Sequence, residues 1–329
     1  MTLPALVYLS KKYDLYYALH DSHVPFFQNY DFLNLVVYPK GQQLDHVDWH
    51  QFAENIKHYN FDICASKMSS DVEEYKLLGL PFYERNRFSH NTNYAENILK
   101  TYHATVLDTQ YPKSEPKLED GIKRIVLYIS SHEVLRRIPD SLFIRLYEEL
   151  IIMNKVLGNK YKIIVMFDAS FKKENILKAV SDKFEVKTDM IITNSSFQSA
   201  RDVIDLFASG VDLLIGADSG ITHLAIMYDT KCYWLETRER MEVVYPKEYH
   251  DLFTVTRLPE PSCKKDCFAR NLYNIFGDTK MDIVPFDKMK HAKPYPRALE
   301  CLKFKEAPCM DYKEEHIQSM LNTICSLLV

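Results

Sequence analysis

Glycine is scarce in this chain, with 8 among 329 residues, while tyrosine is abundant at 22. Because glycine lets the backbone approach a ligand closely, each glycine in a loop is worth locating. Neither GxGxxG nor GxxxxGK[ST] occurs anywhere in the sequence. These absences argue against the ordinary dinucleotide-binding and P-loop interpretations.

Long apolar runs and an excess of positive charge are also absent. No run approaches the roughly 18–20 apolar residues that span a membrane, and the start, MTLPALVYLSKKYD, has too short an apolar part for a secretory signal. The formal net charge is −4 and the pI is near 6.3, which argues against a nucleic-acid partner. We expect a cytoplasmic protein, either free or peripheral at the inner face of the membrane.

Apolar runs alternate with segments of helical period, a pattern typical of an α/β fold. The polar stretch DTQYPKSEPKLEDG, residues 108–121, reads as a linker. Before it we predict strands at Leu15–Leu19, Leu33–Tyr38 and Phe61–Ala65, and helices at Leu3–Lys12, Trp49–His58, Asp71–Leu78 and Tyr94–Tyr102. After it we predict strands at Ile122–Ile129, Ile163–Phe167, Leu213–Gly216 and Cys232–Leu235, and helices at Asp140–Leu157, Lys172–Lys183, Ala200–Ser209, Ile221–Tyr228 and Lys313–Leu328.

Two such units indicate twin Rossmann-like domains that face each other across a cleft. We place an N-terminal domain at 1–115, a C-terminal domain at 116–312 and a final helix at 313–329. The final helix is amphipathic, because its apolar side chains recur on one face: Ile317, Met320, Leu321, Ile324 and Leu328.

The segment GADSGITHLA, from Gly216 to Ala225, joins a buried strand to a helix. Ligands of doubly wound sheets bind at the carboxyl ends of strands, and a helix N-terminus offers N–H groups and partial positive charge to a phosphate. Candidate ligand contacts are the backbone at Gly216 and Gly220, the Ser219 hydroxyl, Asp218, which is also a natural helix cap, and His223 in the first turn. The alternative is that Asp218 and Ser219 only cap the helix and that His223 is an ordinary first-turn histidine.

The pattern DSGxxHLA after a buried strand resembles the signature of the heptosyltransferase family, glycosyltransferase family 9, which has the GT-B fold. The likeness covers most of the chain. LYISSHEVLRRIPDSLFIRLYEEL resembles the first strand, hydroxyl loop and helix of the family's donor domain, SFQSARDVIDLFASGVDLLIG the helix and strand before the signature, and CYWLETRERMEVVYP the segment after it. The resemblance implies transfer of a sugar, with inversion, from a nucleotide-sugar donor such as ADP-heptose to an acceptor hydroxyl.

Carried over position by position, the resemblance also implies a donor site. The diphosphate and sugar would be held by Asp218, Ser219, Gly220 and His223, with hydrogen bonds from Ser130 and Ser131. Arg136 would replace the family's usual lysine as the cation on the phosphates, although a solvated helix start is the other interpretation of this residue. No D-x-D triplet is present to hold a divalent metal, so we expect transfer to need no cofactor.

One part of the family pattern is not found. In the family, a strand and a Gly-Asp loop carrying the acidic base precede a helix that opens with Pro-Ala-Leu, and here little precedes Pro4-Ala5-Leu6. Either the base has moved, the chain is a shortened version, or it is inactive. Because the attacking hydroxyl must lose a proton, we name Asp21 as the candidate base and His223 as a second catalytic candidate. His23 and Asp62 are further acceptor-side candidates.

Four of the seven cysteines come late, as a C-x3-C pair and a C-x7-C pair: Cys263, Cys267, Cys301 and Cys309. Cys309-Met310 is similar to the end of the family's late cysteine cluster. Two interpretations stay open, a thiolate site for structural zinc or iron, and scattered thiols.

The leading hypothesis is an inverting glycosyltransferase whose acceptor is a glycan such as lipopolysaccharide core, or a glycolipid or protein. The first alternative is a non-catalytic nucleotide-sugar-binding protein or partner subunit. The second is a phage-type enzyme that glycosylates DNA bases, against which the acidic pI argues. A metal-dependent hydrolase would need Asp218 and His223 as metal ligands, and neither GxSxG nor HExxH occurs to support it.

Overall fold

The computed structural model describes residues 3–19, 21–37, 54–59, 64–65, 82–83, 122–128, 140–169, 174–185, 189–193, 197–217, 219–235, 241, 245, 247–256 and 313–328. The chain divides into two compact units. Unit 1 holds residues 1–112 and 195–202, and unit 2 holds residues 113–194 and 203–329. The predicted linker and the predicted helices Asp71–Leu78 and Tyr94–Tyr102 lie outside the described residues.

Unit 1 contains a parallel strand pair, β1 (Leu15–Leu19) and β2 (Leu33–Val37), in register from Leu15↔Leu33 to Leu19↔Val37. The crossover between them holds the 3-10 turn η1 (Asp21–His23) and α2 (Val24–Phe27). The ring of Phe27 packs 4.9 Å from that of Tyr17, so this helix covers the strand pair. The other elements are α1 (Leu3–Ser10), η3 (Lys57–Tyr59) and the parallel pair β3 (Cys64–Ala65) and β4 (Phe82–Tyr83).

Unit 2 is built on a six-stranded sheet in which every neighbouring pair is parallel. Its strands are β5 (Lys123–Tyr128), β6 (Tyr161–Asp168), β7 (Asp189–Thr193), β8 (Leu213–Gly216), β9 (Lys231–Leu235) and β10 (Phe253–Thr256). They lie in the order β10-β9-β8-β5-β6-β7. The chain therefore starts in the middle, runs outward through β6 and β7, and returns to the other side of β5. This is the doubly wound, Rossmann strand order.

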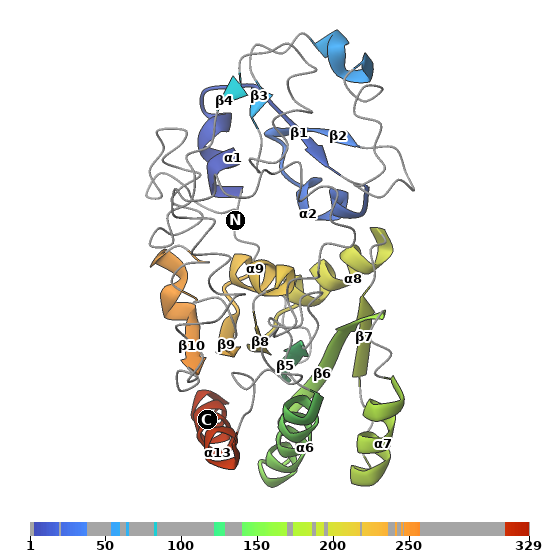
Figure 1. Cartoon of the computed structure of the whole chain (residues 1–329), viewed down its shortest axis with the longest axis vertical. Helices are drawn as coiled ribbons and strands as arrows, with labels where there is room; N and C mark the ends of the chain where they lie inside the picture. The colour runs from blue at the N-terminus through green and yellow to red at the C-terminus, as the bar shows by residue number, and fades with distance from the viewer. Residues whose placement is uncertain are drawn as a thin grey trace, which may run out of the picture. The chain divides into compact units, whose positions relative to one another are not determined.

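Helices cover both faces of this sheet (Figure 1), as parallel strands joined by crossovers require. One face carries α6 (Asp140–Val156) and α7 (Glu174–Phe184), and the opposite face carries α8 (Phe197–Ala208) and α9 (Gly220–Met227). The mixed α/β architecture with parallel sheets confirms the predicted fold class.

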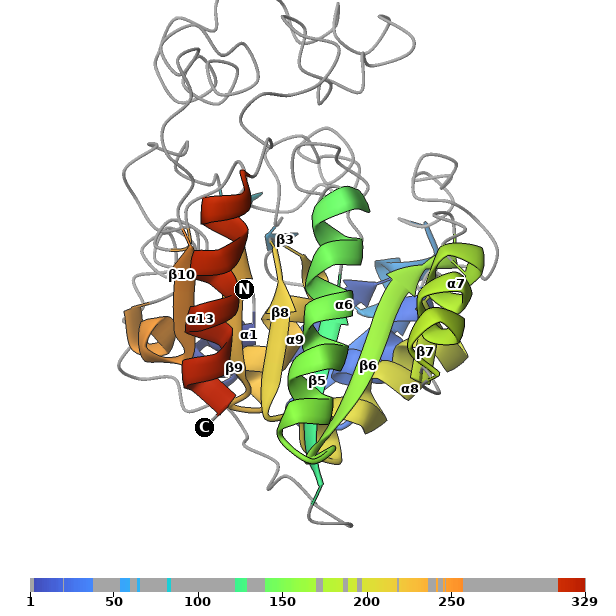
Figure 2. The same cartoon turned by 90° about the horizontal axis from the view of Figure 1, so that it is seen from below.

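The C-terminal helix α13 (Glu314–Leu328) lies beside α6 on the same face of the sheet (Figure 2). Helix α9, which connects β8 to β9, lies on the opposite face. On the face that carries α6, the β8–β9 side of the sheet is therefore covered by α13. The predicted apolar stripe is confirmed, because its buried side chains are Ile317, Met320, Leu321, Ile324 and Leu328. They belong to one core cluster with α6 and the central strands.

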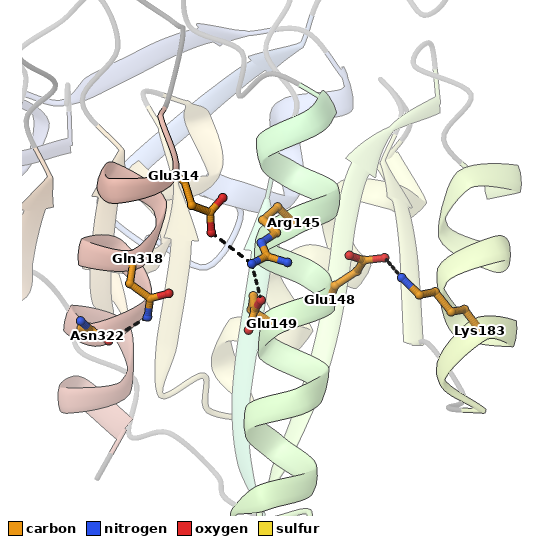
Figure 3. Close-up of polar contacts among 7 residues, drawn as sticks. All are labelled: Arg145, Glu148, Glu149, Lys183, Glu314, Gln318 and Asn322. Atoms are coloured by element: carbon orange, nitrogen blue, oxygen red, sulfur yellow. Dashed lines mark hydrogen bonds and ion pairs between the residues drawn. The ribbon is translucent and has the colours of Figure 1, made fainter.

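Partly exposed ion pairs link the helices of this layer (Figure 3). The Arg145 guanidinium contacts Glu149 at 3.0 Å and Glu314 of α13 at 3.2 Å, and Lys183 contacts Glu148 at 2.7 Å. Because these side chains reach solvent, each pair contributes only about 0.2–1 kcal/mol. Apolar burial is therefore the main attachment of α13.

The predicted central strands and the helices of unit 2 are confirmed to within a few residues at their ends. Two strands were not predicted, β7 and β10, which are the two edges of the sheet. Helix α2 of unit 1 was not predicted either.

Candidate functional site

The strand order of unit 2 has its switch point between β5 and β8. The chain moves away from β5 in one direction and away from β8 in the other. In doubly wound sheets, ligands bind outside the carboxyl ends of the strands at such a switch point. The GADSGITHLA segment follows β8, and the segment with Ser130, Ser131 and Arg136 follows β5 in sequence. Both predicted donor segments therefore leave the two strands that flank the switch point.

Gly216 ends β8 where the sheet needs a residue without a side chain. It pairs with Trp234 of β9, and on its other side the β5–β8 register leads to Tyr128. A Cβ on Gly216 would lie 3.2 Å from the Tyr128 carbonyl oxygen, a tight contact with backbone. Glycine therefore lets the ends of β5 and β8 approach closely.

Ser219, rather than Asp218, caps helix α9. Its backbone is extended (φ −160°, ψ 162°), and its Oγ accepts a 3.2 Å hydrogen bond from the Thr222 N–H. The Thr222 hydroxyl donates to the Ala217 carbonyl at 2.8 Å, so in the 3.0 Å contact between the two hydroxyls Ser219 is the donor. The Ser219 proton is therefore used within the turn, and the contact of this hydroxyl with a phosphate stays a prediction.

The first turn of α9 supplies backbone donors instead. A helix leaves its first N–H groups without carbonyl partners, and Ser219 takes the one on Thr222. The N–H groups of Gly220 and Ile221 are the remaining first-turn donors. Gly220 is exposed and has open space where a Cβ would stand. Backbone N–H groups and the partial positive charge of a helix N-terminus are the features that favour an anion, so binding of a phosphate here stays a prediction.

His223 stands on the same turn, with its N–H donating to the Ser219 carbonyl at 3.3 Å. Its half-buried ring lies against the fully buried ring of Tyr245, with centroids 4.5 Å apart and planes tilted by 44°. Of the predicted donor residues that the structure describes, Ser219, Gly220 and His223 thus lie together at one helix terminus.

Two polar side chains at the carboxyl ends of β5 and β6 were not predicted, Tyr128 and Asp168. Burial, and then the Asp168 carboxylate, raise the pKa of the Tyr128 phenol well above its ordinary value. The phenol therefore keeps its proton and remains a hydrogen-bond donor. Tyr128 and Asp168 come together because they end two neighbouring strands. Which strands are neighbours cannot be read from the spacing of residues in the sequence.

The remaining predicted residues fall elsewhere. Asp21 lies in η1, directly after the carboxyl end of β1 in unit 1, and is half-buried. The described residues do not include Ser130, Ser131, Arg136, Asp62, Asp218 or the four late cysteines. Within the described ranges, no group of three or more His, Cys, Asp or Glu side chains is placed to hold a metal ion. The thiolate metal site stays a prediction. Among the helices so described, none is long and apolar enough to cross a membrane.

The doubly wound sheet, with a helix N-terminus at its switch point, places unit 2 among Rossmann-like domains. The sequence matches no protein-family model and no curated protein. Solved structures resemble the chain over most of its length. The glycosyl transferase family 9 protein from Veillonella parvula aligns over 98% of this chain and 93% of its own, with a TM-score of 0.60 and 15% identity. E. coli ADP-heptose lps heptosyltransferase II aligns over 79% of this chain and 88% of its own, with a TM-score of 0.55 and 12% identity. The chain therefore has the fold of family 9 glycosyltransferases, as the sequence resemblance implied.

Proposed function

We propose that the chain is a glycosyltransferase that binds a nucleotide-sugar donor at the carboxyl edge of the unit 2 sheet. The observation that carries the proposal is the position of the α9 N-terminus, which β8 brings to the switch point beside the end of β5. The shared fold with two glycosyltransferase structures supports it.

On the donor side, the leaving diphosphate gains negative charge as its bond to the sugar breaks. The N–H groups of Gly220 and Ile221 stabilise that charge, and Arg136 adds a cation from the segment after β5. The diphosphate and sugar are also held by side chains of both donor segments: Ser130, Ser131, Asp218, Ser219 and His223. No divalent metal takes part, so chelators leave the rate unchanged.

On the acceptor side, a hydroxyl oxygen attacks the anomeric carbon while the bond from that carbon to the diphosphate oxygen breaks. The configuration inverts, because attack and departure occur on opposite faces. The hydroxyl proton goes to a general base, for which Asp21 is the candidate.

ADP-heptose is the first donor to test, since the E. coli structure of the same fold is an ADP-heptose lps heptosyltransferase. The acceptors to test are lipopolysaccharide core sugars first and proteins second. Donor specificity and acceptor specificity are separate parts of this proposal and are measured separately.

The experiment combines titration calorimetry with ADP-, GDP- and UDP-sugars and a transfer assay on an acceptor panel. We expect Asp218→Ala and His223→Ala to abolish transfer and weaken donor binding in folded protein. We expect Arg136→Ala to weaken donor binding by about 10-fold to 150-fold, the loss of one charge-assisted hydrogen bond. Arg145→Ala is the matched control, because this arginine of α6 pairs with Glu149 and Glu314 on the face of the sheet that α13 covers. Donor binding without turnover on any acceptor would instead indicate a non-catalytic binding protein.

A further inference from the structure

Tyr245 is fully buried, and its ring contacts the imidazole of His223 at a centroid distance of 4.5 Å. A fully buried side chain does not meet a ligand directly. It acts on a binding site only through a neighbour that does reach the ligand. His223 is that neighbour, since it is half-buried and stands on the first turn of α9.

The ring of Tyr245 is itself held on several sides. Trp234 meets it edge-on at 5.3 Å and 88°, and Phe253 packs against it at 4.7 Å. Trp234 is also fully buried, and it is the β9 partner of Gly216. The packing around the Tyr245 ring therefore extends to the end of β8.

The backbone of Tyr245 is fixed as well. Its N–H donates to the Met241 carbonyl at 3.0 Å, and the Nε2 of His250 donates to its carbonyl at 3.0 Å. Side chains packed this closely occupy a single position. Tyr245 is therefore a rigid surface, and the imidazole lies against it.

We propose that Tyr245 is the positioning residue for His223, holding the imidazole beside the α9 N-terminus in the orientation that donor binding and transfer require. The expected effect on donor binding and transfer rests on the proposed function, whereas the ring contact does not depend on it. A misplacement of about 1 Å in a reacting site costs on the order of 100-fold in rate, so a fixed surface behind His223 matters.

The test compares three variants. Tyr245→Phe keeps the aromatic ring, Tyr245→Leu removes it, and Phe253→Leu removes an aromatic that packs on Tyr245 and has no ring contact with His223 among the described residues. The His223 ring resonances of the ligand-free protein report the contact directly, because a ring 4.5 Å away shifts them. We expect the shift to persist in Tyr245→Phe and to vanish in Tyr245→Leu.

Activity is then measured in single and double variants. We expect Tyr245→Leu to lower kcat by about 10-fold to 100-fold and Tyr245→Phe to stay near wild type. Phe253→Leu should lower kcat by less than Tyr245→Leu, because Trp234 still packs against the Tyr245 ring. Because Tyr245 acts through His223, its loss should have little further effect on donor affinity in a His223→Ala background.

His223 resonances that do not respond to Tyr245→Leu would overturn the contact. Resonances that respond while kcat and donor affinity stay unchanged would overturn the positioning role, as would a full Tyr245→Leu effect in the His223→Ala background. Responsive resonances in a wild-type protein that binds no nucleotide sugar would refute the proposed function, and with it the positioning role, while leaving the ring contact established.

Discussion

At the scale of single residues, Gly216 and Gly220 lie four positions apart but lack a side chain for different reasons. The space beside Gly216 is limited by the Tyr128 carbonyl oxygen, whereas the space around Gly220 is open. The first glycine therefore serves the packing of two strand ends, and the second leaves room for a ligand at the helix terminus.

We expect Gly216→Ala to lower the free energy of unfolding by about 1–3 kcal/mol, because backbone must move to admit the Cβ. Gly220→Ala should leave stability unchanged or raise it by up to about 1 kcal/mol, since alanine favours a helix, yet weaken the binding of a nucleoside diphosphate. Denaturant unfolding and calorimetry measure the two effects. Equal stability losses, or full affinity in Gly220→Ala, would contradict this division of roles.

Burial raises the pKa of the Cys232 thiol above its ordinary value of 9.0, and burial with Asp168 raises that of Tyr128 above 10.0. Above those ordinary values the unfolded chain loses protons that the folded chain keeps. The free energy of unfolding therefore falls as the pH rises through this alkaline range, by up to about 1.4 kcal/mol per pH unit for each group.

We expect Cys232→Ala to make this alkaline decline shallower in unfolding curves recorded from pH 8 to 11. Cys325→Ala is the matched control, because that thiol is more exposed and should change the slope less. A decline of the same slope in the Cys232→Ala protein would show that the thiol is not responsible.

The site was predictable where neighbours in sequence are neighbours in space. One helical turn brings Ser219, Gly220 and His223 together, so their grouping follows from spacing. Ser219 caps the helix because its Oγ accepts a hydrogen bond from the Thr222 N–H. Residue spacing alone does not show which of two adjacent residues is the cap. Tyr128, Asp168 and Tyr245 were missed because strand order and tertiary packing bring them to the site from distant positions.

At the scale of elements, the central strands were predictable and the edges were not. β8 is buried at all four positions, which makes a continuous apolar run. In β7 the side chains alternate between half-buried and exposed, and all four of β10 are half-buried. Edge strands bury less surface, so their apolar pattern is weaker and shorter than the pattern of a central strand.

Helix α13 offers an element-scale test, because apolar burial rather than ion pairing attaches it. We expect Met320→Ala to lower the free energy of unfolding by about 2–5 kcal/mol, since Met320 is fully buried in the unit 2 core. Its exposed neighbour serves as control, with Ser319→Ala changing stability by less than about 0.5 kcal/mol. Denaturant unfolding followed by circular dichroism compares them, and similar small effects would place α13 outside the core.

At the scale of the whole molecule, each unit carries parallel strands, and unit 2 has the full doubly wound order. The alternation of strands and helices predicted this class. The order of the strands was not contained in that alternation, and it is the order that makes β5 and β8 neighbours and so sets the switch point.

The most direct measurement is a crystal structure with a bound nucleoside diphosphate, taken in turn from ADP, GDP and UDP. We expect diphosphate oxygens about 2.7–3.2 Å from the N–H nitrogens of Gly220 and Ile221, at the carboxyl ends of β5 and β8. A diphosphate bound away from the α9 N-terminus, or none bound at millimolar concentration, would contradict this prediction.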